Sequence, residues 1–227
     1  MTTQITDTPT PQRADDQESR KMPQTPVIAN LLPRVLAAVC LALAVLAGTA
    51  SLTGVVEGFS WFPYLLLPVF TIHLLGALIR SVRVIRWLAL PATVLAAIVA
   101  IANHDAMTAN TYGFSATQWF FSALSEAGIQ LATQVPPVAS SIYVDFAVLV
   151  LAMCVSLIVE LLATFRRTAL LSIIVLSFAP IVASLFKQEG AGIGYLALLL
   201  IGILGFVALL PHIFKHNSRS SSWTDYR

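Results

Sequence analysis

Charged side chains are scarce in this sequence. Lys, Arg, Asp and Glu together make up 11% of its 227 residues, whereas soluble domains carry about a quarter. A soluble domain of this length would need a polar shell that the chain does not have. The formal net charge is only +2, and the basic residues do not gather into a patch interleaved with aromatic residues. The composition therefore argues against an ordinary soluble domain and against a nucleic-acid partner.

Cysteine and catalytic motifs are also missing or rare. Cys40 and Cys154 are the only two cysteines, and both fall inside apolar runs, where cysteine usually acts as a small hydrophobic residue. The sequence has no glycine-rich phosphate loop, no nucleophile elbow and no Cys–His–Asp arrangement outside the apolar runs. His104 and Asp105 could bind a metal only with partners that the sequence does not supply at a recognisable spacing. We therefore expect no catalytic residue, no cofactor and no metal site.

Long apolar runs are what the sequence does contain. The stretch 35–56 has no charged residue, and roughly 20 apolar residues allow a helix to cross a hydrocarbon core of about 30 Å. The chain has six runs of this character, at 34–56, 62–79, 87–102, 142–164, 169–186 and 191–214. The predicted fold class is all-α: a polytopic helical membrane protein with six transmembrane helices in a domain spanning 34–214.

Small residues in the first run predict close helix packing. Ala44 and Gly48 are four residues apart, as are Ala47 and Ser51, and such pairs let helix backbones approach closely in lipid. We expect them to pack within the chain, with a dimer interface as the alternative.

The segments outside the runs are polar. Residues 1–33 are rich in Thr, Pro, Gln and charge, which predicts a disordered tail, and 215–227 form a second tail. The one long connection is 103–141, where Ser115 and Gln118 fit a helix capping box. Apolar residues then recur at helical spacing: Phe120, Leu124, Ala127 and Leu131. We expect an amphipathic helix that lies on the membrane surface or over the mouth of the bundle.

Basic residues predict the orientation. With six spans, every Lys and Arg except Lys187 falls on the side of the two termini, and the loop 103–141 has none. The connections that decide this are marked by five arginines: Arg80, Arg83, Arg86, Arg166 and Arg167. Because cytoplasmic loops carry the excess of Lys and Arg, both termini are predicted to be cytoplasmic and the long loop external.

Three ionisable residues within the runs are candidate functional residues, because such groups are costly in a membrane. His73 is either a proton relay or cavity-lining group, or a neutral imidazole that bonds to a neighbouring helix. Glu160 is expected to form an interfacial salt bridge, with Arg166 and Arg167 in reach, or else to couple ions. Asp145 lies one turn into its span and can reach water.

Several segments resemble a known family. They are the stretch from Trp119-Phe120-Phe121 to Pro136-Pro137-Val138, the turn from Glu160 to Leu170 (ELLATFRRTAL), a fifth span with a proline and a sixth that opens with glycines. This layout resembles the N-terminal membrane region of bacterial, particularly actinobacterial, transglutaminase-like proteins of the TgpA type, over about 34–214. The resemblance implies a multi-pass protein of the bacterial plasma membrane at the cell envelope.

The same resemblance bears on function. In that family an extracytoplasmic transglutaminase-like domain with a Cys–His–Asp triad follows the membrane region, and a MoxR-type ATPase and a von Willebrand-type protein are frequent companions. Cys40 and Cys154 lie in spans and cannot be that nucleophile, so no catalytic residue carries over. The chain is therefore interpreted as a truncated member, a split gene product or a stand-alone anchor, with a scaffold role. The alternative is a small permease or transporter subunit with His73 and Glu160 along its path, although the halves of the sequence do not repeat.

Overall fold

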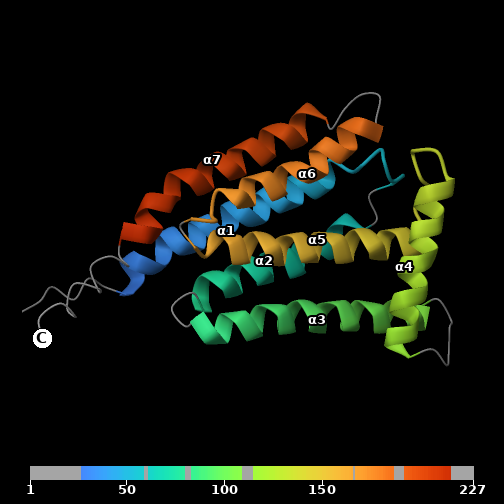
Figure 1. Ribbon diagram of the computed structural model, residues 1–227, viewed down its shortest axis with the longest axis horizontal. Coiled ribbons are helices and arrows are strands. Elements are labelled where there is room, and N and C mark those ends of the chain that lie inside the picture. The colour runs from blue at the N-terminus through green and yellow to red at the C-terminus, as the bar shows by residue number, and fades with distance from the viewer. Residues whose placement is uncertain are drawn as a thin grey trace, which may run out of the picture.

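The structure is a computed structural model that describes residues 27–58, 61–79, 83–108, 115–165, 167–186 and 192–215 (Figure 1). At 27–30, 83–86, 106–108, 186 and 215 it describes the backbone alone. Its helices are α1 (Val27–Ala50), α2 (Phe62–Leu78), α3 (Arg83–Thr108), α4 (Ala116–Thr133), α5 (Ile142–Ala163), α6 (Leu171–Phe186) and α7 (Ile193–Lys215). Within these ranges there is no β-strand, so the predicted all-α fold class is confirmed.

Six of the helices run side by side along the long axis of the molecule, and α4 crosses one end of them (Figure 1). α1 packs against α2, α5, α6 and α7, and α5 packs against α1 to α4 and α6. These two helices therefore form the centre of the bundle. The chain runs up and down through it, so that the end of α3, the beginning of α5 and all of α4 lie together (Figure 1).

Four helices are long and apolar enough to cross a membrane. The apolar stretches are Leu31–Ala50 in α1, Trp87–Asp105 in α3, Ile142–Ala163 in α5 and Ile193–Phe214 in α7. α2 and α6 are also apolar but have 17 and 16 residues. At 1.5 Å per residue they are about 26 Å and about 24 Å long, slightly short of a hydrocarbon core of about 30 Å. The six-span count therefore stays a prediction.

Both ends of α1 differ from the predicted span 34–56. α1 begins at Val27, inside the tail 1–33 that was predicted to be disordered, and the rest of that tail lies outside the described residues. α1 also ends at Ala50 instead of continuing to 56.

Hydroxyl groups mark this early end. Thr49, Ser51 and Thr53 donate hydrogen bonds to the carbonyl oxygens of Val45, Gly48 and Ala50, at 2.8, 2.6 and 2.7 Å. Such local bonds compete with the helical ladder. The backbone beyond Ala50 turns to pair Val56 with Val138, which follows α4.

α3 is longer than predicted at both ends. It starts at Arg83 and continues to Thr108, beyond the expected end at Ala102. His104 and Asp105 thus belong to the last turns of this helix and not to the loop.

α4 begins with the predicted capping box. The Ser115 Oγ accepts a hydrogen bond from the Gln118 N–H at 3.3 Å, and the Gln118 Oε1 accepts one from the Ser115 N–H at 3.1 Å. The fully buried residues of α4 are Trp119, Ala123 and Ala127. Of the predicted apolar face, Ala127 is among them, Phe120 and Leu124 are partly buried against Trp119, Ala123 and Phe146, and Leu131 is exposed. Trp119 packs edge-on against Phe146 of α5, with ring centroids 4.7 Å apart, and this contact fixes α4 to the bundle.

α1 and α7 approach closely, as the small residues predicted. A Cβ atom added at Gly202 of α7 would lie 2.8 Å from the Cys40 carbonyl oxygen and 2.9 Å from the Ala44 Cβ. One added at Gly205 would lie 2.8 Å from the Cys40 Sγ. The prediction that Ala44 packs within the chain is confirmed, and Cys40 serves there as a small packing residue.

Candidate functional site

The structure brings together two of the predicted site residues, His73 of α2 and Glu160 of α5. The His73 Nδ1 and the Glu160 Oε2 are 3.0 Å apart. Their residues are 0% and 3% exposed, so the pair is buried between the two helices. With an ionised carboxylate, which can only accept, the imidazole Nδ1 must carry the proton and donate it to this bond.

A glycine makes this contact possible. Gly76 lies one turn after His73 on the buried face of α2, and a Cβ atom there would collide with the Glu160 carboxyl group. The other ring nitrogen of His73, Nε2, is buried and has no hydrogen-bond partner among the described residues. Chemically, the pair can tie α2 to α5 or hold a proton within the bundle. Removing one partner would leave the other buried and unpaired, which is costly.

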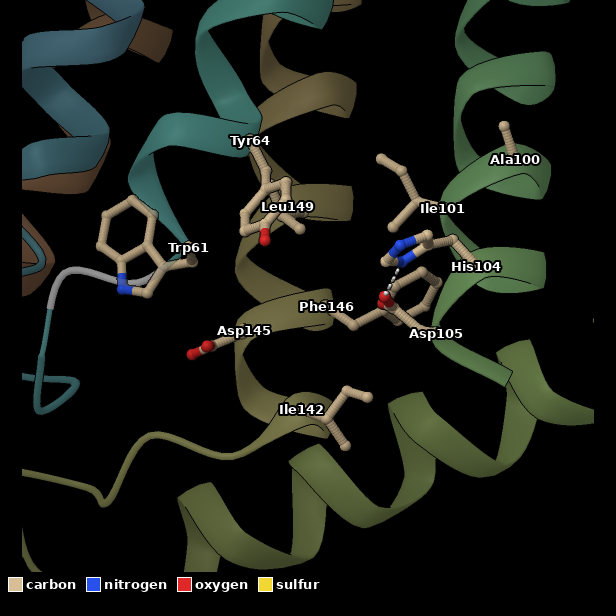
Figure 2. Close-up of a pocket in the computed structure, with 10 residues that line it drawn as sticks. All are labelled: Trp61, Tyr64, Ala100, Ile101, His104, Asp105, Ile142, Asp145, Phe146 and Leu149. Carbon is tan, nitrogen blue, oxygen red and sulfur yellow. Dashed lines mark hydrogen bonds and ion pairs between the residues drawn. The ribbon is translucent and has the colours of Figure 1, made fainter. Parts of the chain in front are cut away.

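A cavity of about 600 Å³ lies at the opposite end of the bundle, beside α4 (Figure 2). Its polar and aromatic lining comes from three helix ends: Trp61 and Tyr64 at the start of α2, His104 and Asp105 near the end of α3, and Asp145 and Phe146 in α5. Figure 2 shows His104 and Asp105 on the side of α3, facing Trp61 and Tyr64 across the cavity.

The two carboxylates of the cavity are held differently. The Asp145 carboxylate accepts hydrogen bonds from the Ser140 hydroxyl at 3.0 and 3.1 Å. The Asp105 Oδ1 lies 3.3 Å from the His104 Nδ1, and the side chain of His104 is 68% exposed whereas that of Asp105 is 17% exposed. The cavity is thus acidic, with an imidazole at its edge. Within the described ranges, no three His, Cys, Asp or Glu side chains are grouped to hold a metal ion.

A family model, described as the TgpA N-terminal domain, matches residues 43–225. The chain belongs to the TgpA N-terminal domain family. The resemblance to the N-terminal region of TgpA-type proteins is therefore confirmed, and the matched region includes both the His73–Glu160 pair and the acidic cavity. No curated protein matches the chain. No solved structure matches it either.

The pairing inside this TgpA N-terminal domain differs from the one expected for Glu160. Arg166 and Arg167 were expected within its reach, but in the structure its carboxylate has His73 as a partner. Arg166 lies outside the described residues, and Arg167 directly follows it in the chain.

The remaining arginines of the prediction lie at helix ends or beyond them. Arg80 falls outside the described residues, and Arg83 and Arg86 are in the first turns of α3, where the structure gives only the backbone. Their proposed effect on orientation is not tested by these positions.

Sequence reasoning found Asp145 but missed the rest of the cavity as a site. His104 and Asp105 were placed in the long connection 103–141. A periodicity search could have extended α3 through Asp105, because Ile98, Ile101 and Asp105 recur at helical spacing. The meeting of three helix ends has no such local signal.

Proposed function

We propose that this chain is the membrane anchor and scaffold region of a TgpA-type transglutaminase-like protein. The family match over residues 43–225 supports this most strongly, because it covers most of the helical bundle. The outward surface agrees with an anchor. Large apolar side chains are exposed on several helices, including Leu67 (78%), Leu88 (71%) and Ile174 (67%). Exposed apolar surface of this kind fits lipid and would be a liability in water.

The proposed arrangement has six spans in a bacterial plasma membrane, with both termini in the cytoplasm and α4 outside. α2 and α6 lie alongside the longer helices (Figure 1). A span a few ångströms short of the bilayer is accommodated at modest cost by local thinning.

Cysteine labelling tests this orientation. In a Cys40→Ala, Cys154→Ala background, Gly128→Cys reports on α4 and Leu170→Cys on the turn between α5 and α6. An impermeant maleimide added to intact cells should label Gly128→Cys at once and Leu170→Cys only after permeabilisation. The opposite pattern would refute the orientation.

The scaffold role is tested at the chromosomal locus with an N-terminal tag. A membrane band much larger than 24.4 kDa would place a transglutaminase-like domain on the same polypeptide. If the band lies at 24.4 kDa, the tagged protein should instead co-purify, after mild crosslinking, with a separate transglutaminase-like protein. Enrichment of a MoxR-type ATPase and a von Willebrand-type protein would extend the scaffold to those partners. A chain with neither a larger band nor a transglutaminase-like companion would contradict the proposal.

The buried His73–Glu160 pair also fits a second function, that of a small permease or transporter subunit. His73 and Glu160 form a polar pair that is buried between helices α2 and α5, and such pairs also occur along proton paths. Liposomes with the purified chain and an internal pH dye separate the two functions. The scaffold proposal expects a proton leak equal to that of empty liposomes. A leak that Glu160→Gln abolishes in a folded protein would favour transport.

A further inference from the structure

The acidic cavity adjoins an apolar groove. The groove, of about 490 Å³, lies between α2 and α3, where Leu67, Pro68 and Ala97 are among its walls. Three residues line both spaces: Tyr64, Ala100 and Ile101. The two spaces therefore form one elongated site, polar at the end of the bundle and apolar along the helices.

The groove lies on the outside of the bundle. Leu67 is 78% exposed and Tyr64 is 64% exposed, and the α3 wall falls within the apolar stretch Trp87–Asp105. When such a stretch crosses a membrane, acyl chains are the molecules that meet its exposed surface. The natural occupant of the groove is therefore a lipid chain.

The polar end selects the headgroup by charge. Asp105 is the last residue of its apolar stretch and Asp145 is in the first turn of α5, so both carboxylates lie where a span meets the headgroup region. None of the described residues that line the cavity is Lys or Arg. Carboxylates form charge-assisted hydrogen bonds to an ammonium group, and aromatic rings such as those of Trp61 and Tyr64 attract cations.

The edge of the cavity suits the phosphate group, which follows the ammonium in a phospholipid headgroup. His104 is exposed there, and an imidazole can donate a hydrogen bond to a phosphate oxygen. In an ethanolamine phospholipid, the phosphate is two carbons from the ammonium. This spacing places an anion beside the imidazole while the cation faces the carboxylates.

We propose that the cavity and the groove together bind a membrane phospholipid with a primary ammonium headgroup, its ammonium at Asp105 and Asp145 and one acyl chain between α2 and α3. An anchor needs no particular lipid, so this goes beyond the scaffold role. A chain that holds its partners but shows no lipid preference would overturn this proposal alone.

Native mass spectrometry of the full chain tests the headgroup. The protein is mixed with equal amounts of three lipids that carry the same acyl chains and ethanolamine, choline or glycerol headgroups. The ethanolamine lipid should be retained about tenfold over the glycerol lipid, the effect expected from a charge-assisted hydrogen bond. It should also exceed the choline lipid, whose ammonium has no N–H to donate. Equal retention of the three lipids would overturn the proposal.

Variants locate the headgroup. Asp105→Asn combined with Asp145→Asn should bring the ethanolamine preference within about twofold. Glu57→Gln is the matched control, because Glu57 is an exposed carboxylate at the same end of the bundle but does not line the cavity. An unchanged preference in the double variant, with a helical content like that of the parent, would place the headgroup elsewhere.

A second pair of variants tests the groove. Ala97→Phe fills the groove without touching the acidic cavity and should remove the retained lipid. Leu95→Phe adds a ring on the same helix at a position that is 63% exposed and lines neither space, so it should leave retention intact. Soluble phosphoethanolamine should compete only weakly. Competition as strong as that of the lipid would mean that the cavity binds a small cation and that the groove takes no part.

Discussion

Gly76→Ala isolates the contact between α2 and α5. The added methyl group would collide with the Glu160 carboxyl group, which is held 3.0 Å from the His73 Nδ1. Because Glu160 is 3% exposed, its carboxylate cannot turn into water without a shift of the helix. We therefore expect the substitution to break the His73–Glu160 bond rather than to be absorbed by a small movement.

The expected size of the effect follows from opposing terms. Alanine in a helix is more favourable than glycine by about 1 kcal/mol. Loss of a hydrogen bond to a charged group costs about 1.5–3 kcal/mol, and a buried charge left without its partner raises this to about 3–5 kcal/mol. The net expectation is a free energy of unfolding lowered by about 2–4 kcal/mol. In a Glu160→Ala background the obstacle is gone, and Gly76→Ala should become stabilising by up to about 1 kcal/mol.

Unfolding of the purified chain in mixed micelles by added dodecyl sulfate, followed by circular dichroism, gives these free energies. Gly128→Ala is the control, because a Cβ atom at this α4 position would meet nothing within 4 Å and should stabilise slightly. The reasoning is refuted if Gly76→Ala is as stable as the parent, or if its effect has the same sign with and without the Glu160 side chain.

Three further substitutions have clear expectations. Gly202→Ala should weaken the α1–α7 contact by about 1–3 kcal/mol, since its methyl would press on the Cys40 backbone; an unchanged unfolding midpoint in dodecyl sulfate would contradict this. Ser115→Ala removes the capping bond of α4 and should cost about 1 kcal/mol, seen as faster amide exchange in the first turn of α4; Ser115→Asp should restore protection. Trp119→Ala deletes the contact with Phe146 at a cost of about 3–5 kcal/mol, and limited proteolysis should then cut α4 while α5 stays protected; equal resistance of the two helices would contradict it.

The helices could be predicted from the sequence because their signals are local. An uncharged stretch such as 35–56 and the Ser115–Gln118 spacing are both contained in a few turns of chain. Helix ends were harder. α1 starts at Val27, inside a segment whose average composition is polar. Near its other end, the Thr49 hydroxyl bonds back to the Val45 carbonyl. A single hydroxyl group hardly changes the average hydropathy of the run, so the average does not reveal where the helix ends.

The site was harder still, because it depends on how helices are rotated against each other. Periodicity shows that His73 and Gly76 share a face of α2, but it does not show which residue of α5 that face meets. Glu160 was judged by its distance from the end of its span, and that distance suggested nearby arginines. The acidic cavity likewise joins Tyr64, Asp105 and Asp145 from three helices, a meeting that only tertiary packing determines.

The close fit of α1 to α7 has a consequence for biogenesis. Cys40 and Gly202 touch through helices at opposite ends of the described chain, whereas spans enter a membrane in the order of their synthesis. During translation, the small-residue surface of α1 therefore stays unpacked until α7, its principal neighbour, has been inserted. Contacts so distant in sequence form late. The packing of α1 therefore depends on the insertion of α7. A nascent chain stalled before Gly202 would leave the small-residue face of α1 unpacked and accessible to quality-control proteases of the membrane.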